Sequence, residues 1–384
     1  MSTEVTLAIR HGVRWLLAAI LGGCTTVGVG QPPQETVVST ENFVEHKIDL
    51  GNDTSSAGGI ATFTLHINEG ETGFTFFGEA DHLLMIERLT DPSGKTASKW
   101  QTWWYGNQDL TDAFWPYYNE VSLTWPMVEE NSPLEAGDWT VQVASVDANW
   151  AYLGGVPIHA SARIRTDENP DEGHVRIALV WAKDVENEPG VSEAVDQAID
   201  HWREIWAPAG LTLEVREVSS NLDPSLDPPW ETTSGVAEAA TLADDGEIVV
   251  LMGDLLHDNP TWYGVSGGIP GPLEITGHSA TSVSWLAHAG TDAKFNHDEI
   301  LLFGETLAHE VGHYLGLQHP VQSDYSRWDT LADTPQCQNA NTCESDLGDN
   351  IMFPYSICDN NGCVDALYLT DEQIGQLDVA GGAR

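Results

Sequence analysis

The spacing of hydrophobic residues divides the chain into two parts. Between residues 43 and 166 apolar and polar positions alternate with a period of two, as in Ile60–Ile67 and in 139–144. The tetrapeptide DPSG at 91–94 predicts a turn between two such runs. Because no helical period is found there, we predict an antiparallel β-sandwich domain over 43–166.

After an acidic, turn-rich segment at 167–173 the pattern changes. Val191–Trp206 has apolar residues at helical spacing and ends before a Pro-Ala-Gly sequence. Apolar or alternating runs predict strands at 174–182, 211–218, 247–252 and 278–285. This order of strands and helices predicts a mixed sheet with helices packed on it. The predicted fold class is therefore α+β, with a second domain over 174–384.

The first residues have the features of an export signal. Arg10 and Arg14 precede a short apolar run that is far below membrane-spanning length. The run ends in LGGC at 21–24, which resembles a bacterial lipobox. We predict a signal peptide over 1–23, lipidation at Cys24 and a tethering linker over 24–42. A cleaved signal without lipid is the alternative.

The other cysteines lie close together near the C-terminus. Cys337, Cys343, Cys358 and Cys363 can form disulfides in three pairings, and the sequence does not choose between them. In an exported protein, disulfides are favoured over a second zinc site built from the same thiols.

The formal net charge is −44, from 59 acidic and 15 basic residues. Such a surface repels phosphate backbones, which excludes DNA and RNA as partners. Several aspartates flank the C-terminal motifs, and oxygen-rich loops of this kind suit calcium. Calcium is therefore a second candidate cofactor, with candidate residues at Asp324, Asp329, Asp333, Asp346 and Asp349.

A helix is predicted from about residue 297 within the segment NHDEILLFGETLAHEVGHYLGLQHP, which spans 296–320. Asn296 or Asp298 can cap its first turn. Apolar residues recur at three- and four-residue steps along one face, namely Ile300, Phe303, Leu307, Val311 and Leu315.

Three histidines and a glutamate in this segment have the spacing of a metal centre. His309 and His313 are four residues apart, so their rings lie one helical turn apart and can share one ion. Gly316 can end the helix and turn the chain back, which brings His319 in as a third ligand. Glu310 lies beside these ligands, where a general base is needed. The pattern predicts a zinc ion held by three imidazoles, with Glu310 as catalytic base.

The motif HEVGHYLGLQH at 309–319 resembles the long zinc signature of the metzincin peptidases. Met352, in GDNIM, then corresponds to the methionine of their Met-turn, beneath the three imidazoles. The sequence WDTLADTPQC and the clustered cysteines are most similar to the pappalysin-type branch, which implies two disulfides in this region and raises the expectation of calcium. The resemblance implies a mixed twisted sheet, an active-site helix and a Met-turn C-terminal subdomain. Tyr355 follows Met352 by three residues instead of two, so packing is the expected role of its side chain.

We therefore predict a zinc-dependent endopeptidase that acts on proteins or peptides, is expected to be a monomer, and contacts membrane only through its lipid anchor. It would be exported and anchored to the bacterial cell envelope, or secreted. An extended substrate is expected to lie along the strand at 278–285. The alternative is a catalytically silent surface protein that binds through the aromatic-rich stretch at 100–125, although core packing is the favoured explanation for those rings.

Overall fold

The structure is a computed structural model. It describes residues 36–39, 43–101, 108–109, 111–116, 119–128, 134–167, 172–226, 234–244, 246–271, 280–290, 293–329, 331–359 and 362–380. These residues all belong to one compact unit, Pro33–Arg384. Within the described ranges, no helix has both the length and the apolar character needed to span a bilayer. The predicted signal peptide and Cys24 lie outside the described residues.

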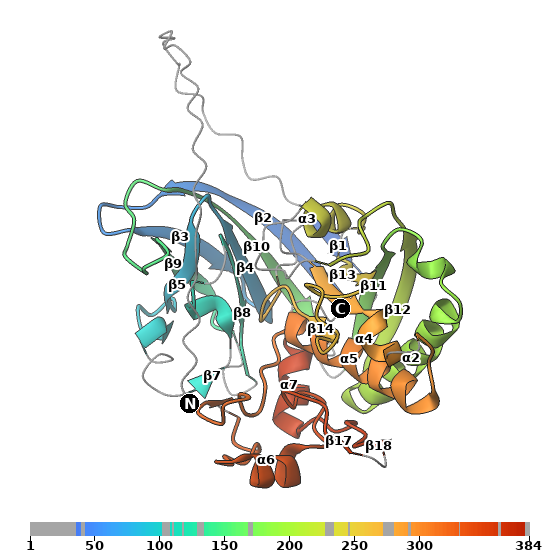
Figure 1. Cartoon of the computed structure of the whole chain (residues 1–384). Helices are drawn as coiled ribbons and strands as arrows, with labels where there is room; N and C mark the ends of the chain where they lie inside the picture. Colours follow the sequence, from blue (N-terminus) through green and yellow to red (C-terminus); the bar gives the residue numbers. More distant parts are fainter. Residues whose placement is uncertain are drawn as a thin grey trace. The chain divides into compact units, whose positions relative to one another are not determined.

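Two antiparallel sheets occupy the first part of the chain (Figure 1). One has the strand order β1-β2-β10-β4-β8 and the other β3-β9-β5-β6. The strands are β1 (Thr36–Ser39), β2 (Phe43–Thr54), β3 (Ile60–Ile67), β4 (Gly73–Glu79), β5 (Leu83–Thr90), β6 (Thr96–Lys99), β8 (Glu120–Trp125), β9 (Gly137–Val146) and β10 (Pro157–Asp167). Both sheets contribute to one hydrophobic core, because alternate residues of strands such as β3, β9 and β10 face inward.

Three local predictions in this part can be compared with the structure. The turn at 91–94 is present, since the Gly94 N–H donates to the Asp91 carbonyl at 2.9 Å. Residues 36–39 were expected in the linker but form the edge strand β1, because the sequence TVVS suits a strand and pairs antiparallel with β2. Of the aromatic stretch, Phe114 and Trp125 are buried in the core, as core packing predicts.

The second part contains a mixed five-stranded sheet of order β12-β11-β13-β15-β14. Its strands are β11 (Gly173–Trp181), β12 (Leu211–Ser219), β13 (Ile248–Gly253), β14 (Gly264–Val265) and β15 (Ala280–Ser284). All neighbours pair parallel except β14, which pairs antiparallel with β15. With the helices described next, this arrangement confirms the predicted α+β class.

The strand predicted at 278–285 differs from the structure in two ways. Trp285 begins α4 (Trp285–Ala289), because the Ser284 side chain caps that helix by accepting the Ala287 N–H. In addition, β15 is not the edge of the sheet, since β14 pairs with it at Gly264 and Val265. The strand at this edge of the sheet is therefore β14.

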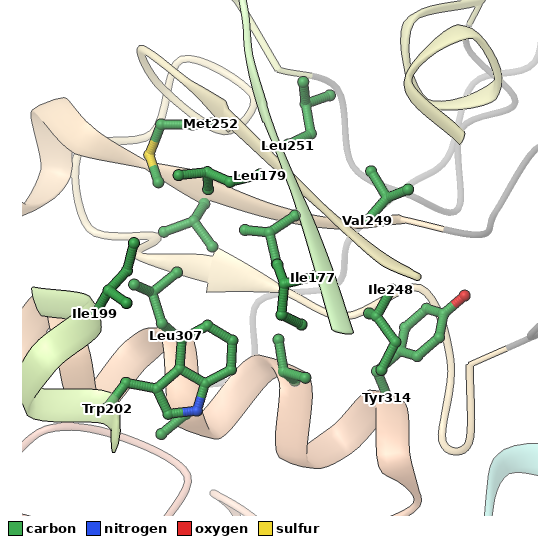
Figure 2. Packing of buried hydrophobic residues seen from close by; sticks show 14 of the residues in the cluster. Ile177, Leu179, Ile199, Trp202, Ile248, Val249, Leu251, Met252, Leu307 and Tyr314 are labelled. Carbon is green, nitrogen blue, oxygen red and sulfur yellow. The ribbon is translucent and has the colours of Figure 1, made fainter. Parts of the chain in front are cut away.

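Two long helices pack beside this sheet, α2 (Val191–Trp206) and α5 (His297–Leu315). Figure 2 shows Leu307 of α5 with Ile199 and Trp202 of α2, next to Ile177 and Leu179 of β11. All five side chains are buried. The shorter helices are α3 (Ser234–Ala240), α6 (Ala340–Leu347) and α7 (Asp371–Asp378).

Strands of the first part also contact the C-terminal segments. Arg165 of β10 is buried and donates to the carbonyls of Val379 and Ala380, which follow α7. Leu331 lies in the hydrophobic core of the two antiparallel sheets. Short strands β7 (Gln108–Asp109) and β16 (Trp328–Asp329) pair in parallel. The two parts of the chain are therefore joined by backbone and side-chain contacts.

Gly304 should be essential for the close approach of α5 and α2. A Cβ at this position would lie 2.6 Å from the Ala198 carbonyl oxygen and 3.0 Å from the His201 Cβ. Gly304→Ala should lower the free energy of unfolding by about 1–3 kcal/mol, because backbone must move to relieve the overlap. Urea unfolding tests this, with Gly235→Ala in α3 as control, since a Cβ there meets nothing within 4 Å. Equal stability of both variants would contradict the prediction.

Candidate active site

The ends of α5 are defined by its sequence. Asn296 is the N-cap, and its side chain and that of Glu299 form a reciprocal capping box. Gly316 ends the helix with φ 114°, a conformation that glycine adopts without the steric cost of a Cβ. The Leu317 N–H then donates to the Gly312 carbonyl, so the chain turns back along the helix. Both ends agree with the prediction.

This turn brings three histidines together. The His319 Nε2 lies 3.2 Å from the His309 Nε2 and 3.0 Å from the His313 Nε2. Donors of a tetrahedral zinc with bonds of 2.0–2.1 Å are about 3.4 Å apart. The three nitrogens are thus spaced as ligands of one ion, and they are the only such group of His, Cys, Asp or Glu found in the described ranges.

Hydrogen bonds fix the orientation of the rings. The His309 Nδ1 is 2.7 Å from the Ile351 carbonyl and the His313 Nδ1 is 2.6 Å from the Leu317 carbonyl. Because a carbonyl can only accept, each of these Nδ1 atoms carries the proton and each Nε2 carries a lone pair. Lone pairs that face one point repel each other unless a cation lies between them. The donor set therefore fits a bound zinc ion.

The surroundings keep the imidazoles neutral. Burial lowers the pKa of His309 to about 4 and that of His319 to about 3, and the neighbouring His309 adds to the effect on His319. Burial and both neighbouring histidines hold the pKa of His313 well below its usual value. Neutral imidazole is the form that binds metal. The lowered pKa values therefore keep all three rings in the form that can act as metal ligands.

Glu310 lies on the same helix and is 9 % exposed. Burial raises the pKa of its carboxyl to about 8, and the Ser266 N–H, which follows β14, donates to it. Gly264 of β14 makes room for it, because a Cβ there would lie 2.5 Å from the Glu310 Cγ. The edge strand and the glutamate are therefore in direct contact.

Met352 packs against α5 at Gly312. It is fully buried, and a Cβ on Gly312 would lie 2.9 Å from its Sδ. The Asn350 side chain accepts the Met352 N–H at 2.9 Å and donates to Gln373 of α7 at 2.7 Å. The same turn supplies the Ile351 carbonyl that orients His309.

A cleft of about 470 Å³ opens beside this group. His309, Glu310 and Glu305 line it from α5, and β14 lines it from the sheet edge. Further lining comes from residues 261–263, which precede β14, from most of the segment 348–357, and from Val364 and Ala366. Sequence reasoning did not identify Glu305 or Gly264, because neither belongs to a motif and only their place in the fold puts them at the cleft.

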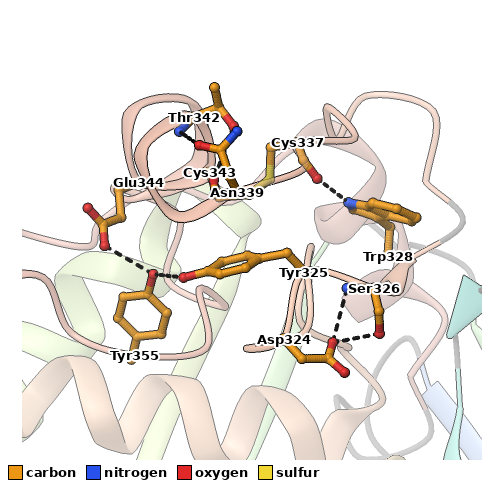
Figure 3. The surroundings of a disulfide bond; sticks show 10 residues. All are labelled: Asp324, Tyr325, Ser326, Trp328, Cys337, Asn339, Thr342, Cys343, Glu344 and Tyr355. Atoms are coloured by element: carbon orange, nitrogen blue, oxygen red, sulfur yellow. Dashed lines mark hydrogen bonds between the residues drawn. A yellow bond between two sulfur atoms is a disulfide. The ribbon is translucent and has the colours of Figure 1, made fainter. Parts of the chain in front are cut away.

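The cysteines pair locally, Cys337 with Cys343 and Cys358 with Cys363. This pairing excludes the alternative of a second zinc site on these thiols. Figure 3 shows the first disulfide near Tyr325, whose hydroxyl is 2.7 Å from that of Tyr355. The Tyr355 hydroxyl also donates to Glu344 at 3.1 Å and its ring packs on Phe353, as expected for a packing residue.

The aspartates considered for calcium do not gather around one point in the part of the chain that the structure describes. Asp329 is buried, accepts the Leu331 N–H and Thr334 hydroxyl, and belongs to β16. Asp333 accepts the Glu372 N–H at the start of α7. These carboxylates therefore cap turns and helix ends, and the calcium prediction has no support.

Comparison with known proteins supports a metallopeptidase. Residues 272–378 match the model of peptidase family M43, described as pregnancy-associated plasma protein-A. This stretch contains the three histidines, Glu310 and Met352, so the match agrees with the resemblance to pappalysin-type metzincins. It covers somewhat more than a quarter of the chain. Among curated proteins, none has a sequence that matches this chain.

Solved structures show only distant similarity. Archaemetzincin from Methanopyrus kandleri is 14% identical with a TM-score of 0.26, over 54% of this chain and 88% of that one. Metalloproteinase-II from Bacteroides fragilis is also 14% identical with a TM-score of 0.26, over 48% of this chain and 61% of that one. A TM-score of this size does not establish a shared fold.

Metal binding should depend on the three imidazoles acting together. We expect about one zinc per chain by mass spectrometry, and a chelator should lower the Tm because metal stabilises only the folded state. His313→Ala should lose the metal and the response to chelator. His66→Ala is the matched control, since that ring is 66% exposed on the surface. Full zinc content in His313→Ala would contradict the assignment.

Proposed function

We propose that this chain is a zinc-dependent endopeptidase. The observation that carries the proposal is the convergence of three imidazole Nε2 atoms beside a buried glutamate at a cleft. The match to a peptidase family over the same residues supports it. In the proposed site His309, His313 and His319 hold the metal, Glu310 is the catalytic base, and Met352 belongs to a Met-turn that supports the rings.

The chemistry divides between the metal and the chain. When bound, zinc supplies a Lewis acid that lowers the pKa of water and polarises a carbonyl. Glu310 takes the proton from the attacking water and later gives it to the leaving amine, a role that its position at the cleft next to His309 allows. The Ser266 N–H orients that carboxyl toward the cleft.

The substrate is proposed to be an extended peptide that lies along β14. This strand is the sheet edge next to Glu310, and its outer side has no strand partner among the described residues. A peptide added there gains backbone hydrogen bonds that do not depend on its sequence. Protein or peptide substrates follow from this geometry, and nucleic acid remains excluded by the net charge of −44.

We also propose the domain boundaries and the cellular location. The sheets between 43 and 166 would form a β-sandwich domain and 174–384 the peptidase domain.

The two disulfides are compatible with an exported protein. A signal peptide over 1–23 and a lipid anchor at Cys24 would tether the enzyme to the cell envelope. The anchor can be tested by growing the expressing cells with labelled palmitate. The purified protein should carry the label, and Cys24→Ala should not.

Glu310 should be required for hydrolysis but not for metal binding. Purified chain should cleave a denatured protein, and Glu310→Ala should lose at least about 10²-fold in kcat/KM because proton transfer is lost. Zinc content should be unchanged. Equal cleavage by both proteins would mean that the activity comes from elsewhere. No cleavage by either, with zinc bound, would favour a silent binding protein.

Gly264→Ala tests the position of Glu310 independently. The added methyl group would overlap Glu310, so the carboxyl must move away from the attacking water. We expect kcat/KM to fall about 10- to 100-fold with zinc content and Tm retained. Gly235→Ala, where the new Cβ meets nothing, should leave activity unchanged. Normal activity in Gly264→Ala would show that Glu310 acts from another position.

A further inference from the structure

One side of the cleft is formed by residues 363–368, which we call the cleft wall. Val364 and Ala366 line the cleft from this segment. The wall begins at the second disulfide, and the Val364 N–H donates to the Ile357 carbonyl at 2.8 Å. Its first residues are therefore held by a short, closed hairpin.

The other end of the wall is attached to the turn that carries Met352. The Tyr368 N–H donates to the Asp349 carbonyl at 3.0 Å, and the Tyr368 carbonyl accepts the Ile351 N–H at 2.8 Å. Ala366 lies between these two anchored ends. Its N–H donates to a side chain instead of the backbone, the Oε1 of Glu305 at 3.1 Å.

Glu305 is an unusual residue for this place. It is 6% exposed and lies on α5 one turn before His309. No ion pair joins it to a lysine or arginine in the described ranges. Burial and the nearby Asp365 raise the pKa of its carboxyl to about 8. Burying such a group is costly unless it makes a needed hydrogen bond.

We propose that Glu305 is a positioning residue for substrate: its carboxyl oxygen holds the middle of the cleft wall against α5 and so sets the width of the cleft. This inference rests on the proposed peptidase function. Glu305 is then engaged with the wall and is not a partner for cationic substrate side chains. The pocket between the wall and α5, lined also by Ile357 and Phe353, would accept uncharged side chains.

Two substitutions separate the hydrogen bond from the charge. Glu305→Gln keeps an acceptor and should change KM by no more than about 2-fold. Glu305→Leu removes the acceptor and should raise KM about 5- to 30-fold, with kcat within about 3-fold and zinc retained. Ala366→Pro removes the donor and should have a similar effect. The double variant should be no worse than either single one, because both changes break the same bond.

Hydrogen exchange gives a readout that does not depend on cleavage. Glu305→Leu should speed exchange in 363–368 and leave α5 protected, whereas Glu305→Gln should change neither. Unchanged KM and unchanged exchange in Glu305→Leu would overturn the inference while the parent still cleaves. A second result would also overturn it. If Glu305→Gln raised KM as much as Glu305→Leu, but only for substrates with Lys or Arg, the charge of Glu305 would contact the substrate directly. If the parent does not cleave, the proposed function fails and exchange alone decides the role of Glu305.

Discussion

The structure around the cleft depends on one electrostatic constraint, the convergence of three buried imidazoles whose Nε2 atoms meet at a common point. Burial keeps the rings neutral, but burial alone does not orient them. Orientation comes from carbonyl acceptors at Nδ1, supplied by Ile351 and Leu317. Both acceptors lie outside α5. The helix therefore cannot form the centre by itself, and the turns on either side must hold their carbonyls in place.

This constraint explains why α5 is buried on nearly all sides. Its apolar face packs on α2 and the sheet, while its ligand face needs a cleft wall, an edge strand and a supporting turn. Such close packing leaves little room for side chains. Glycine is accordingly found where backbone or a functional group approaches most closely, at Gly304 beside α2, Gly312 above Met352 and Gly264 beside Glu310.

Features that are encoded locally could be predicted from the sequence. The helix Val191–Trp206 and the capped start and glycine end of α5 agree with their predictions, because periodicity and capping act within a few residues. The grouping of His309, His313 and His319 also follows from helical geometry and one turn. These features needed no knowledge of distant contacts.

Features that depend on distant contacts could not be predicted in the same way. Strand β14 has only two residues, too few to show a period, and it defines the sheet edge only through its pairing with β15. Trp285 continues an apolar run, yet the Ser284 cap starts a helix there. The contact between Glu305 and Ala366, which are 61 residues apart, likewise depends on how separate segments meet in space.

The strands of the first part belong to the same network that holds the three histidines. Arg165 of β10 donates to the carbonyls of Val379 and Ala380, and so satisfies groups left free after α7. Within α7, Gln373 holds Asn350, whose side chain accepts the Met352 N–H. A buried arginine in one sheet is thus connected through α7 to the turn that supplies the acceptor for His309. Because a buried guanidinium without acceptors is costly, these strands and the C-terminal helix stabilise each other, and the position of that turn depends on both.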